Sequence, residues 1–101
     1  MTSSRTEIRV PLIRNVQVTD DSLAVDLEDG RTVVVPLAWY PRLVHGNAEE
    51  RGHWELIGRG EGIHWSDLDE DISIANLLDG KRSGESQRSF ARWLEDRTTI
   101  R

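Results

Sequence analysis

The strongest constraint on the fold is an alternation of apolar and polar residues just before the dipeptide Asp29-Gly30. The apolar members of this alternation are Leu23, Val25 and Leu27. A period of two is typical of a β-strand with one buried face. Glycine adopts the positive φ angle of a tight turn without strain, so residues 31–37 are expected to return as the second strand of an antiparallel hairpin.

Three consecutive valines at positions 33–35 leave the register of this hairpin open. A two-residue loop would place Val25 opposite Val34, whereas a bulged loop would place Val25 opposite Val33. A strand that is apolar on both faces is either covered on both or in contact with another chain. The sequence therefore permits both registers.

Other short periodic segments fill the rest of the first 80 residues. The predicted elements are strands over residues 13–19 and 54–58 and helices over residues 38–51 and 74–78. The first helix is expected to break near Gly46, and Ser73 and Gly80 suit the two ends of the second. These patterns predict an α+β fold with a small antiparallel hairpin or meander sheet, short helices and a C-terminal amphipathic helix.

That C-terminal helix is predicted over residues 86–97, after a linker-like stretch at 81–85. Its apolar stripe and basic border consist of Phe90, Trp93 and Leu94 with Arg88, Arg92 and Arg97. We therefore divide the chain into a domain at residues 1–80 and a linker with helix at residues 81–101. Trp93 either docks on its own domain or anchors another protein, because aromatic and Arg side chains dominate protein interfaces.

The two segments carry charges of opposite sign within a formal net charge of −5. Residues 1–80 contain seven Arg and fifteen acids, and residues 81–101 contain six basic residues and three acids. The basic tail can fold back on its acidic domain or meet an acidic partner. The net charge disfavours direct binding to nucleic acid, which depends on clustered basic side chains.

The absence of cysteine excludes disulfides and thiolate catalysis and fits a reducing compartment. The first residues lack the apolar run of a signal peptide, and no segment approaches the about 20 apolar residues of a membrane span. A cytoplasmic protein without membrane contact is the expectation.

A His-Trp pair that runs into dense acids is the most distinctive motif of the chain. Its residues are Gly62, His64, Trp65, Asp67, Leu68, Asp69, Glu70 and Asp71. The spacing lacks the alternating ligands of a calcium loop and has no second His at helical spacing. A structural role for an acidic turn is favoured, so we expect no metal, no cofactor and no catalytic residues.

This motif and its surroundings resemble domain of unknown function family 2442. The likeness rests on Asp29-Gly30-Arg31, Tyr40-Pro41-Arg42-Leu43, Trp54 to Gly58, and the run from Gly62 to Ser73. It covers most of residues 10–80, and the segment from Ser83 to Leu94 resembles an extension found in some members. The resemblance implies a small bacterial α+β domain, alone or ahead of a helix-turn-helix module, without established catalytic residues.

The resemblance also implies a neighbouring gene for another small protein, an arrangement similar to toxin–antitoxin pairs. We therefore expect a noncatalytic protein-interaction module, the antitoxin-like member of such a pair, which binds and blocks its partner. The expected contact residues are Arg88, Phe90, Arg92, Trp93, Leu94 and Arg97. The alternatives are a DNA-linked transcriptional regulator or its accessory and, last, a metal-dependent enzyme. A homo-oligomer is left open.

Overall fold

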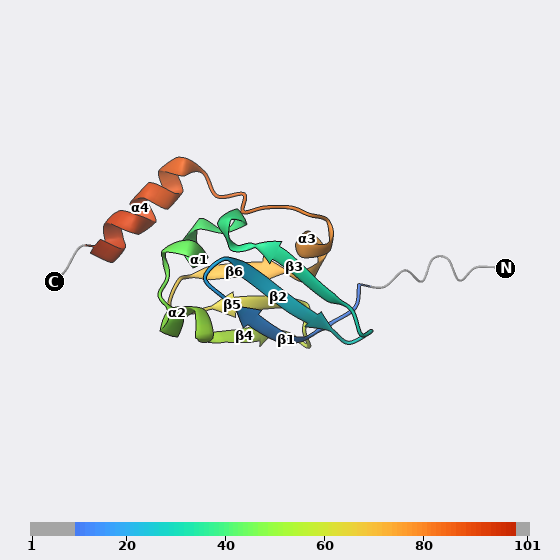
Figure 1. The fold of residues 1–101 in the computed structure, drawn as a ribbon. Coiled ribbons are helices and arrows are strands. Elements are labelled where there is room, and N and C mark those ends of the chain that lie inside the picture. The colour runs from blue at the N-terminus through green and yellow to red at the C-terminus, as the bar shows by residue number, and fades with distance from the viewer. Residues whose placement is uncertain (1–9, 99–101) are drawn as a thin grey trace.

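Two antiparallel sheets of three strands each form the body of the protein in a computed structural model that describes residues 10–98 (Figure 1). The first sheet has the order β1-β2-β3, and the second has the order β4-β5-β6. Their bounds are β1 (Ile13–Val18), β2 (Ser22–Leu27), β3 (Thr32–Pro36), β4 (Trp54–Ile57), β5 (Gly62–Trp65) and β6 (Glu70–Ser73). Each sheet is thus a meander of consecutive strands, as the α+β prediction requires.

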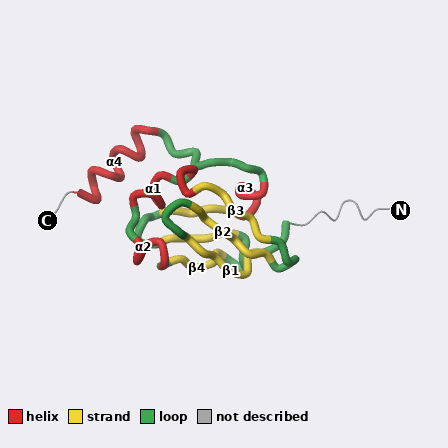
Figure 2. Tube along the Cα trace, in the orientation of Figure 1, coloured by secondary structure: helices red, strands yellow, loops and turns green. Residues whose placement is uncertain are grey.

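Short helices lie around these sheets, and a longer one projects from the body (Figure 2). They are the 3-10 helix η2 (Leu37–Trp39), α1 (Pro41–His45), α2 (Ala48–Gly52), α3 (Ile74–Leu78) and α4 (Gln87–Thr98). In Figure 1, α1 and α2 lie at one end of the sheets and α3 at the other. In the described part of the chain, no helix combines the length and apolar character needed to cross a bilayer.

The core lies between the inner faces of the two sheets. The first sheet contributes Ile13, Val16, Leu23, Val25, Leu27 and Val35, and the second contributes Ile63, Trp65 and Ile72. Trp65 is fully buried, and its indole N–H donates to the backbone carbonyl of Arg51 at 3.0 Å. The backbone N–H of Ile13 donates to the carbonyl of Gly60 at 2.8 Å and joins the sheets directly.

The first hairpin adopts the bulged register. Val25 lies opposite Val33, and the backbone N–H of Leu27 donates to the carbonyl of Arg31 at 2.8 Å. Gly30 closes the loop with a φ of 97°, a conformation that favours glycine. Val34 consequently points away from the core and is 61% exposed.

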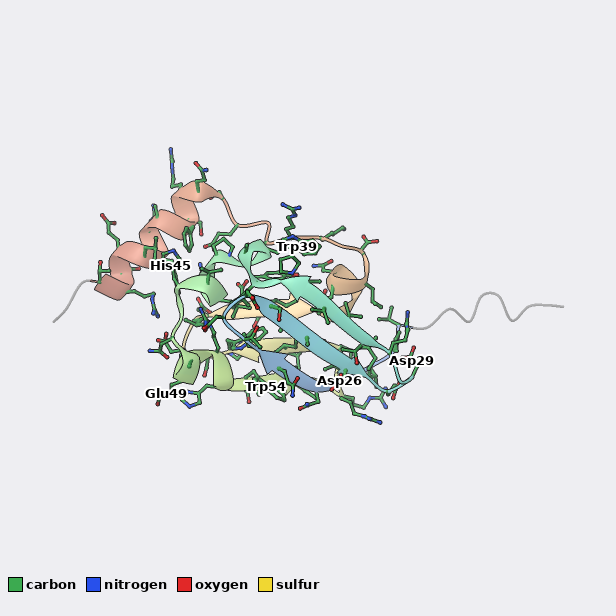
Figure 3. All side chains as sticks on the ribbon, in the orientation of Figure 1. Asp26, Asp29, Trp39, His45, Glu49 and Trp54 are labelled. Carbon is green, nitrogen blue, oxygen red and sulfur yellow. The ribbon has the colours of Figure 1, made fainter. Side chains whose placement is uncertain are left out.

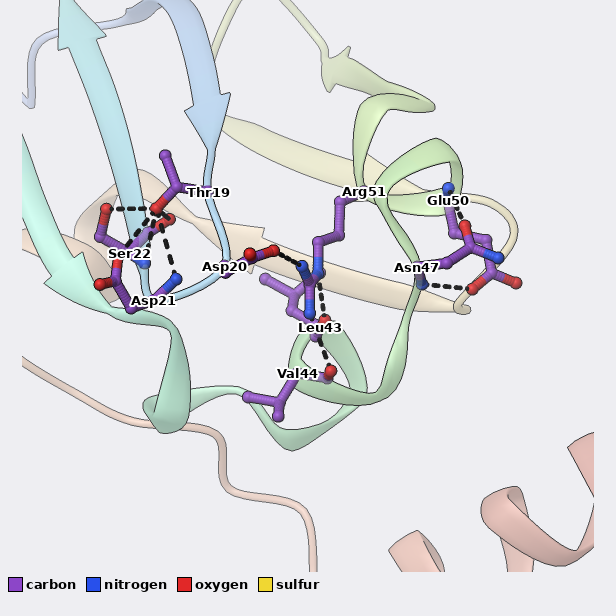
Figure 4. Close-up of polar contacts among 9 residues, drawn as sticks. All are labelled: Thr19, Asp20, Asp21, Ser22, Leu43, Val44, Asn47, Glu50 and Arg51. Atoms are coloured by element: carbon purple, nitrogen blue, oxygen red, sulfur yellow. Dashed lines mark hydrogen bonds and ion pairs between the residues drawn. The ribbon is translucent and has the colours of Figure 1, made fainter.

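The predicted break near Gly46 is confirmed, because α1 and α2 are separate helices. Asn47 caps α2: its side chain accepts from the Glu50 N–H at 2.8 Å, and the Glu50 carboxylate accepts from the Asn47 N–H at 2.9 Å (Figure 4). Arg51 donates to the backbone carbonyls of Leu43 and Val44, each at 2.8 Å. The carbonyls at the end of α1 are thereby satisfied by a side chain from α2.

The prediction that the acidic run at residues 67–71 forms only a turn is wrong for its last two residues. The turn ends at Asp69, which has a φ of 53°, and Glu70 then begins β6. The alternation in Glu70-Asp71-Ile72-Ser73 explains the strand, since Ile72 enters the core while Asp71 faces outward. The helix ends predicted at Ser73 and Gly80 are confirmed: Ser73 Oγ accepts from the Asn76 N–H at 3.1 Å, and Gly80 has a φ of 74°.

Candidate functional site

Helix α4 rests on the body through one half-buried stripe. Phe90, Trp93, Leu94 and Arg97 recur at helical spacing and lie on this stripe, and none of the described residues of the helix is fully buried. Ser86 Oγ accepts from the Ser89 N–H at 3.1 Å and caps the start of the helix. The sequence therefore builds a helix that docks on the body without entering its core.

The centre of this contact is the indole ring of Trp93. The guanidinium groups of Arg42 and Arg97 lie 5.0 and 4.8 Å from its ring centroid. Phe90 stacks on Trp93 at 5.7 Å with an interplanar angle of 20°. Phe90 also meets His45 of α1 edge to face at 5.3 Å, and Figure 3 shows His45 on the side of α1 that faces α4. Cations over an aromatic face make this a favourable polar and aromatic contact.

Two Arg–Glu pairs hold the linker and the helix to the body. Arg42 Nε donates to Glu85 Oε1 at 2.9 Å, and the two side chains are only 14% and 12% exposed. The Ser89 hydroxyl also donates to Glu85, at 2.7 Å. At the other end of α4, Arg97 donates to both carboxylate oxygens of Glu50 at 3.1 Å. The basic tail thus folds back on acidic and basic groups of its own domain.

These contacts lower the pKa values of both carboxyl groups. The hydrogen bond from Arg42 lowers the pKa of Glu85, and the hydrogen bond from Arg97 lowers the pKa of Glu50. Hydrogen bonds from a cation favour the ionised form of an acid. Both glutamates are therefore charged partners of arginine at neutral pH.

The six residues expected to contact a partner divide between two sides of α4. Phe90, Trp93, Leu94 and Arg97 face the body, while Arg88 and Arg92 are exposed one turn apart on the outer side. Within residues 10–98, neither Arg88 nor Arg92 has an ion-pair partner. Trp93 docks on its own domain, and its role in binding another protein remains a prediction.

A cleft of about 420 Å³ lies beside this contact, between α1, β6 and the linker. Arg42, Glu70, Glu85 and Ser89 are among its lining residues. The linker closes one wall, where the Tyr40 hydroxyl donates to the carbonyl of Lys81 at 3.2 Å and the Ser83 N–H donates to the carbonyl of Trp39 at 3.0 Å.

Glu70 is the unusual group of this cleft. The strand registers align Trp54, Trp65 and Glu70 in one row, and Trp65 shows that the row faces inward. The Glu70 carboxyl group has no hydrogen-bond partner among the described residues. Burial raises its pKa from 4.5 to about 7, and the charge of Arg42 opposes this rise. Glu70 is therefore poised to exchange a proton near neutrality.

The residues of the His-Trp motif separate into three environments. Trp65 and Leu68 are fully buried, Glu70 faces the cleft, and His64 pairs with Asp71 on the outer face of the second sheet. Asp67 pairs with Nδ1 of His53 at 2.6 Å. Gly62 lies close to the carbonyl of Ile72. The backbone carbonyl of Asp69 accepts a hydrogen bond from the Arg42 guanidinium group. Among residues 10–98, no three His, Cys, Asp or Glu side chains are placed to hold a metal ion together.

Hydrogen bonds to carboxylates raise the pKa values of both motif-associated histidines. Asp71 is the main cause at His64, and Asp67 is the main cause at His53. The register also places Glu55 beside His64, opposite Asp71, which adds a second negative charge. This outer row stabilises the imidazolium form of His64.

Several residues of the docking contact carry no sequence signal of their own. Isolated charges are common on any surface, so no sequence pattern assigns Arg42, Glu50 or Glu85 to this contact. The opposite net charges of the two segments were the available signal, and it indicated attraction without naming the pairs. The inward position of Glu70 depends on the strand β6, which the sequence pattern does not predict.

The meander sheets and the docked C-terminal helix define a small α+β domain with a helical extension. The chain belongs to the family described as "Protein of unknown function (DUF2442)", whose model matches residues 13–83. A search of curated proteins finds no match to it.

Two solved structures share the fold. A protein of unknown function from Rhodospirillum rubrum, seen in a crystal structure, is 26% identical with a TM-score of 0.67; the match covers 78% of this chain and 98% of that protein. The uncharacterized protein CV0863 from Chromobacterium violaceum, a solution NMR structure, is 20% identical with a TM-score of 0.63; the match covers 97% of this chain and 84% of that one.

Proposed function

We propose that this protein is a noncatalytic interaction module, the antitoxin-like member of a two-gene pair, which binds and blocks a small partner protein through α4. The observation that carries the proposal is the position of Trp93. Its ring is half-buried, with the guanidinium groups of Arg42 and Arg97 within about 5 Å of the ring centroid, on a helix without a fully buried residue. Trp and Arg are the side chains most enriched at the energetic centres of protein interfaces.

The nature of the docking contact supports exchange of α4 between its own domain and a partner. The contact consists of aromatic stacking, cation–π contacts and ion pairs, with little apolar burial. Cation–π contacts of this kind contribute about 0.5–2 kcal/mol each. A partner that offers an apolar pocket for Trp93 competes with a contact of this size.

Binding is tested by co-expressing this chain with the protein encoded beside it and purifying the pair through a tag on this chain. A double variant, Phe90→Ala with Trp93→Ala, is expected to weaken the complex by at least about 30-fold, the cost of losing one interface hot spot. The matched control is Arg14→Ala, an exposed residue of β1. If the double variant binds as tightly as the control, α4 is not the contact; if no complex forms with the wild-type chain, the proposed function fails.

The alternative of a DNA-linked regulator rests on the exposed Arg88 and Arg92. Both point away from the body, and neither has an ion-pair partner among the described residues. Binding through them would weaken steeply with salt, because phosphate contacts release counterions. A mobility-shift assay at low salt, with and without the partner, is expected to show no shift if α4 serves protein binding alone. A shift that disappears in Arg88→Ala with Arg92→Ala would favour the regulator instead.

A further inference from the structure

One guanidinium group, that of Arg42, joins several segments at the docking contact of α4. Arg42 donates to Glu85 of the linker and to the carbonyl of Asp69 at 2.8 Å, and it lies over the ring of Trp93. The carboxylate oxygen Oδ2 of Asp69 lies 3.7 Å from Nη1 of the same guanidinium group. Arg42 therefore joins α1, the turn before β6, the linker and α4 at a single point.

Glu70 lies beside this junction and faces charged or titratable groups from every neighbouring segment. They are Tyr40 and Arg42 at the start of α1, Asp69 and Asp71 around β6, and Lys81, Arg82 and Glu85 of the linker. Among the carboxylates, Glu85 opposes ionisation of Glu70 most strongly, and Arg42 favours it. Of these opposing acids, only Glu85 comes with the docked tail.

Docking and the charge of Glu70 are consequently coupled. When the linker and α4 dock, Glu85 is held near Glu70 and the linker closes one wall of the cleft, and both effects disfavour the ionised carboxylate. Because docking disfavours ionisation of Glu70, ionisation of Glu70 must in turn disfavour docking by the same free energy. The docked state therefore binds the Glu70 proton more tightly than the undocked state, and docking weakens as the pH rises.

We propose that Glu70 is a proton-operated latch for α4: the neutral carboxyl group permits docking of the linker and helix, and the ionised carboxylate favours their release. The latch regulates the same helix that the proposed function assigns to partner binding, and its biological role rests on that function. The docking equilibrium of α4 can be measured in the isolated chain, without a partner. Release of α4 above neutral pH would expose Trp93 and Phe90 to a partner.

The latch is tested by measuring the distance between α4 and the body as a function of pH. The chain has no cysteine, so Arg14→Cys with Ala91→Cys places two dyes at exposed positions of β1 and α4. Between pH 6 and pH 8 the ratio of undocked to docked chains is expected to rise about three- to tenfold, since each pKa unit added by docking changes that ratio tenfold. Glu70→Gln, which keeps the shape of the neutral acid, is expected to remove this response.

A control variant separates the latch from other titrations. Glu55→Gln removes an exposed glutamate on the outer face of the same sheet and should leave the response intact. A response that survives in Glu70→Gln, disappears in Glu55→Gln, or is absent from the wild-type chain overturns the proposal.

A second measurement tests the coupling from the opposite side. In the full chain, Glu85→Gln removes the charge that docking brings to Glu70, so the Glu70 carboxyl resonance should titrate at lower pH than in the wild type. Arg14→Ala should leave that midpoint unchanged. An unchanged midpoint in Glu85→Gln contradicts the latch. Neither measurement uses a partner, so failure of the latch and failure of partner binding are distinguishable.

Discussion

Gly46 lies directly against the side chain of Leu68. A Cβ atom at position 46 would be 2.8 Å from Leu68 Cδ1, closer than real Cβ contacts allow. The backbone does not require glycine there, because its φ of −76° suits any residue. The contact instead fixes the connection between α1 and α2 against the turn that joins β5 to β6, where Leu68 is fully buried.

Gly46→Ala is therefore expected to destabilise the protein by about 1–3 kcal/mol, as overpacking a filled core does. Urea unfolding followed by circular dichroism measures the change. Gly52→Ala is the matched control, because no atom lies within 4 Å of a Cβ placed at that position. Adding Leu68→Val should recover part of the loss in Gly46→Ala; a wild-type midpoint for Gly46→Ala would show that the site relaxes freely.

Removal of residues 87–101 is expected to leave the body folded, with a loss of less than about 2 kcal/mol in the free energy of unfolding. None of the described residues of α4 is fully buried, and the contacts removed are partly buried surface contacts such as the Arg97–Glu50 pair. Trp65→Ala in the full-length chain, by contrast, is expected to cost about 3–5 kcal/mol. Thermal unfolding compares the two, and a truncated chain that does not fold would show that α4 is part of the core structure.

Protonation of His64 is expected to stabilise the fold at low pH. Its pKa is raised in the folded state because Asp71 accepts a hydrogen bond from the imidazolium. The stabilisation is fully present below the ordinary pKa of about 6.5 and is lost as the pH rises through the higher folded pKa. In His64→Gln, and equally in Asp71→Asn, this part of the pH dependence of the melting temperature should be absent. A pH profile identical to that of the wild type would contradict the pairing.

Local patterns in the sequence predicted the first hairpin, the break at Gly46 and the helix ends at Ser73 and Gly80. These features depend on neighbouring residues: alternation, a positive φ at glycine, and side-chain caps. The sequence permits two registers of the hairpin because Val33 and Val34 are chemically identical. Only packing of the second sheet on the first decides which valine is buried.

The missed features depend on contacts between distant segments. The strand β6 was concealed because Asp69 and Asp71 read as turn residues, and pairing with β5 overrides that tendency. The pairs Arg42–Glu85 and Arg97–Glu50 join residues separated by 43 and 47 positions, so no local pattern identifies them. The charge difference between the two segments predicted attraction, but only the folded structure shows which side chains form the ion pairs.

The consecutive order of strands in each sheet also has a kinetic consequence. Each pairing within a sheet closes only a short loop, which costs little chain entropy, so the two meanders are expected to form rapidly and independently. The slow event is then their collision, when the Ile13 N–H meets the Gly60 carbonyl and the indole of Trp65 leaves water. If the transition state lies at this joining step, the two sheets fold as separate units. The segment that carries α1 and α2 is then the connection between them.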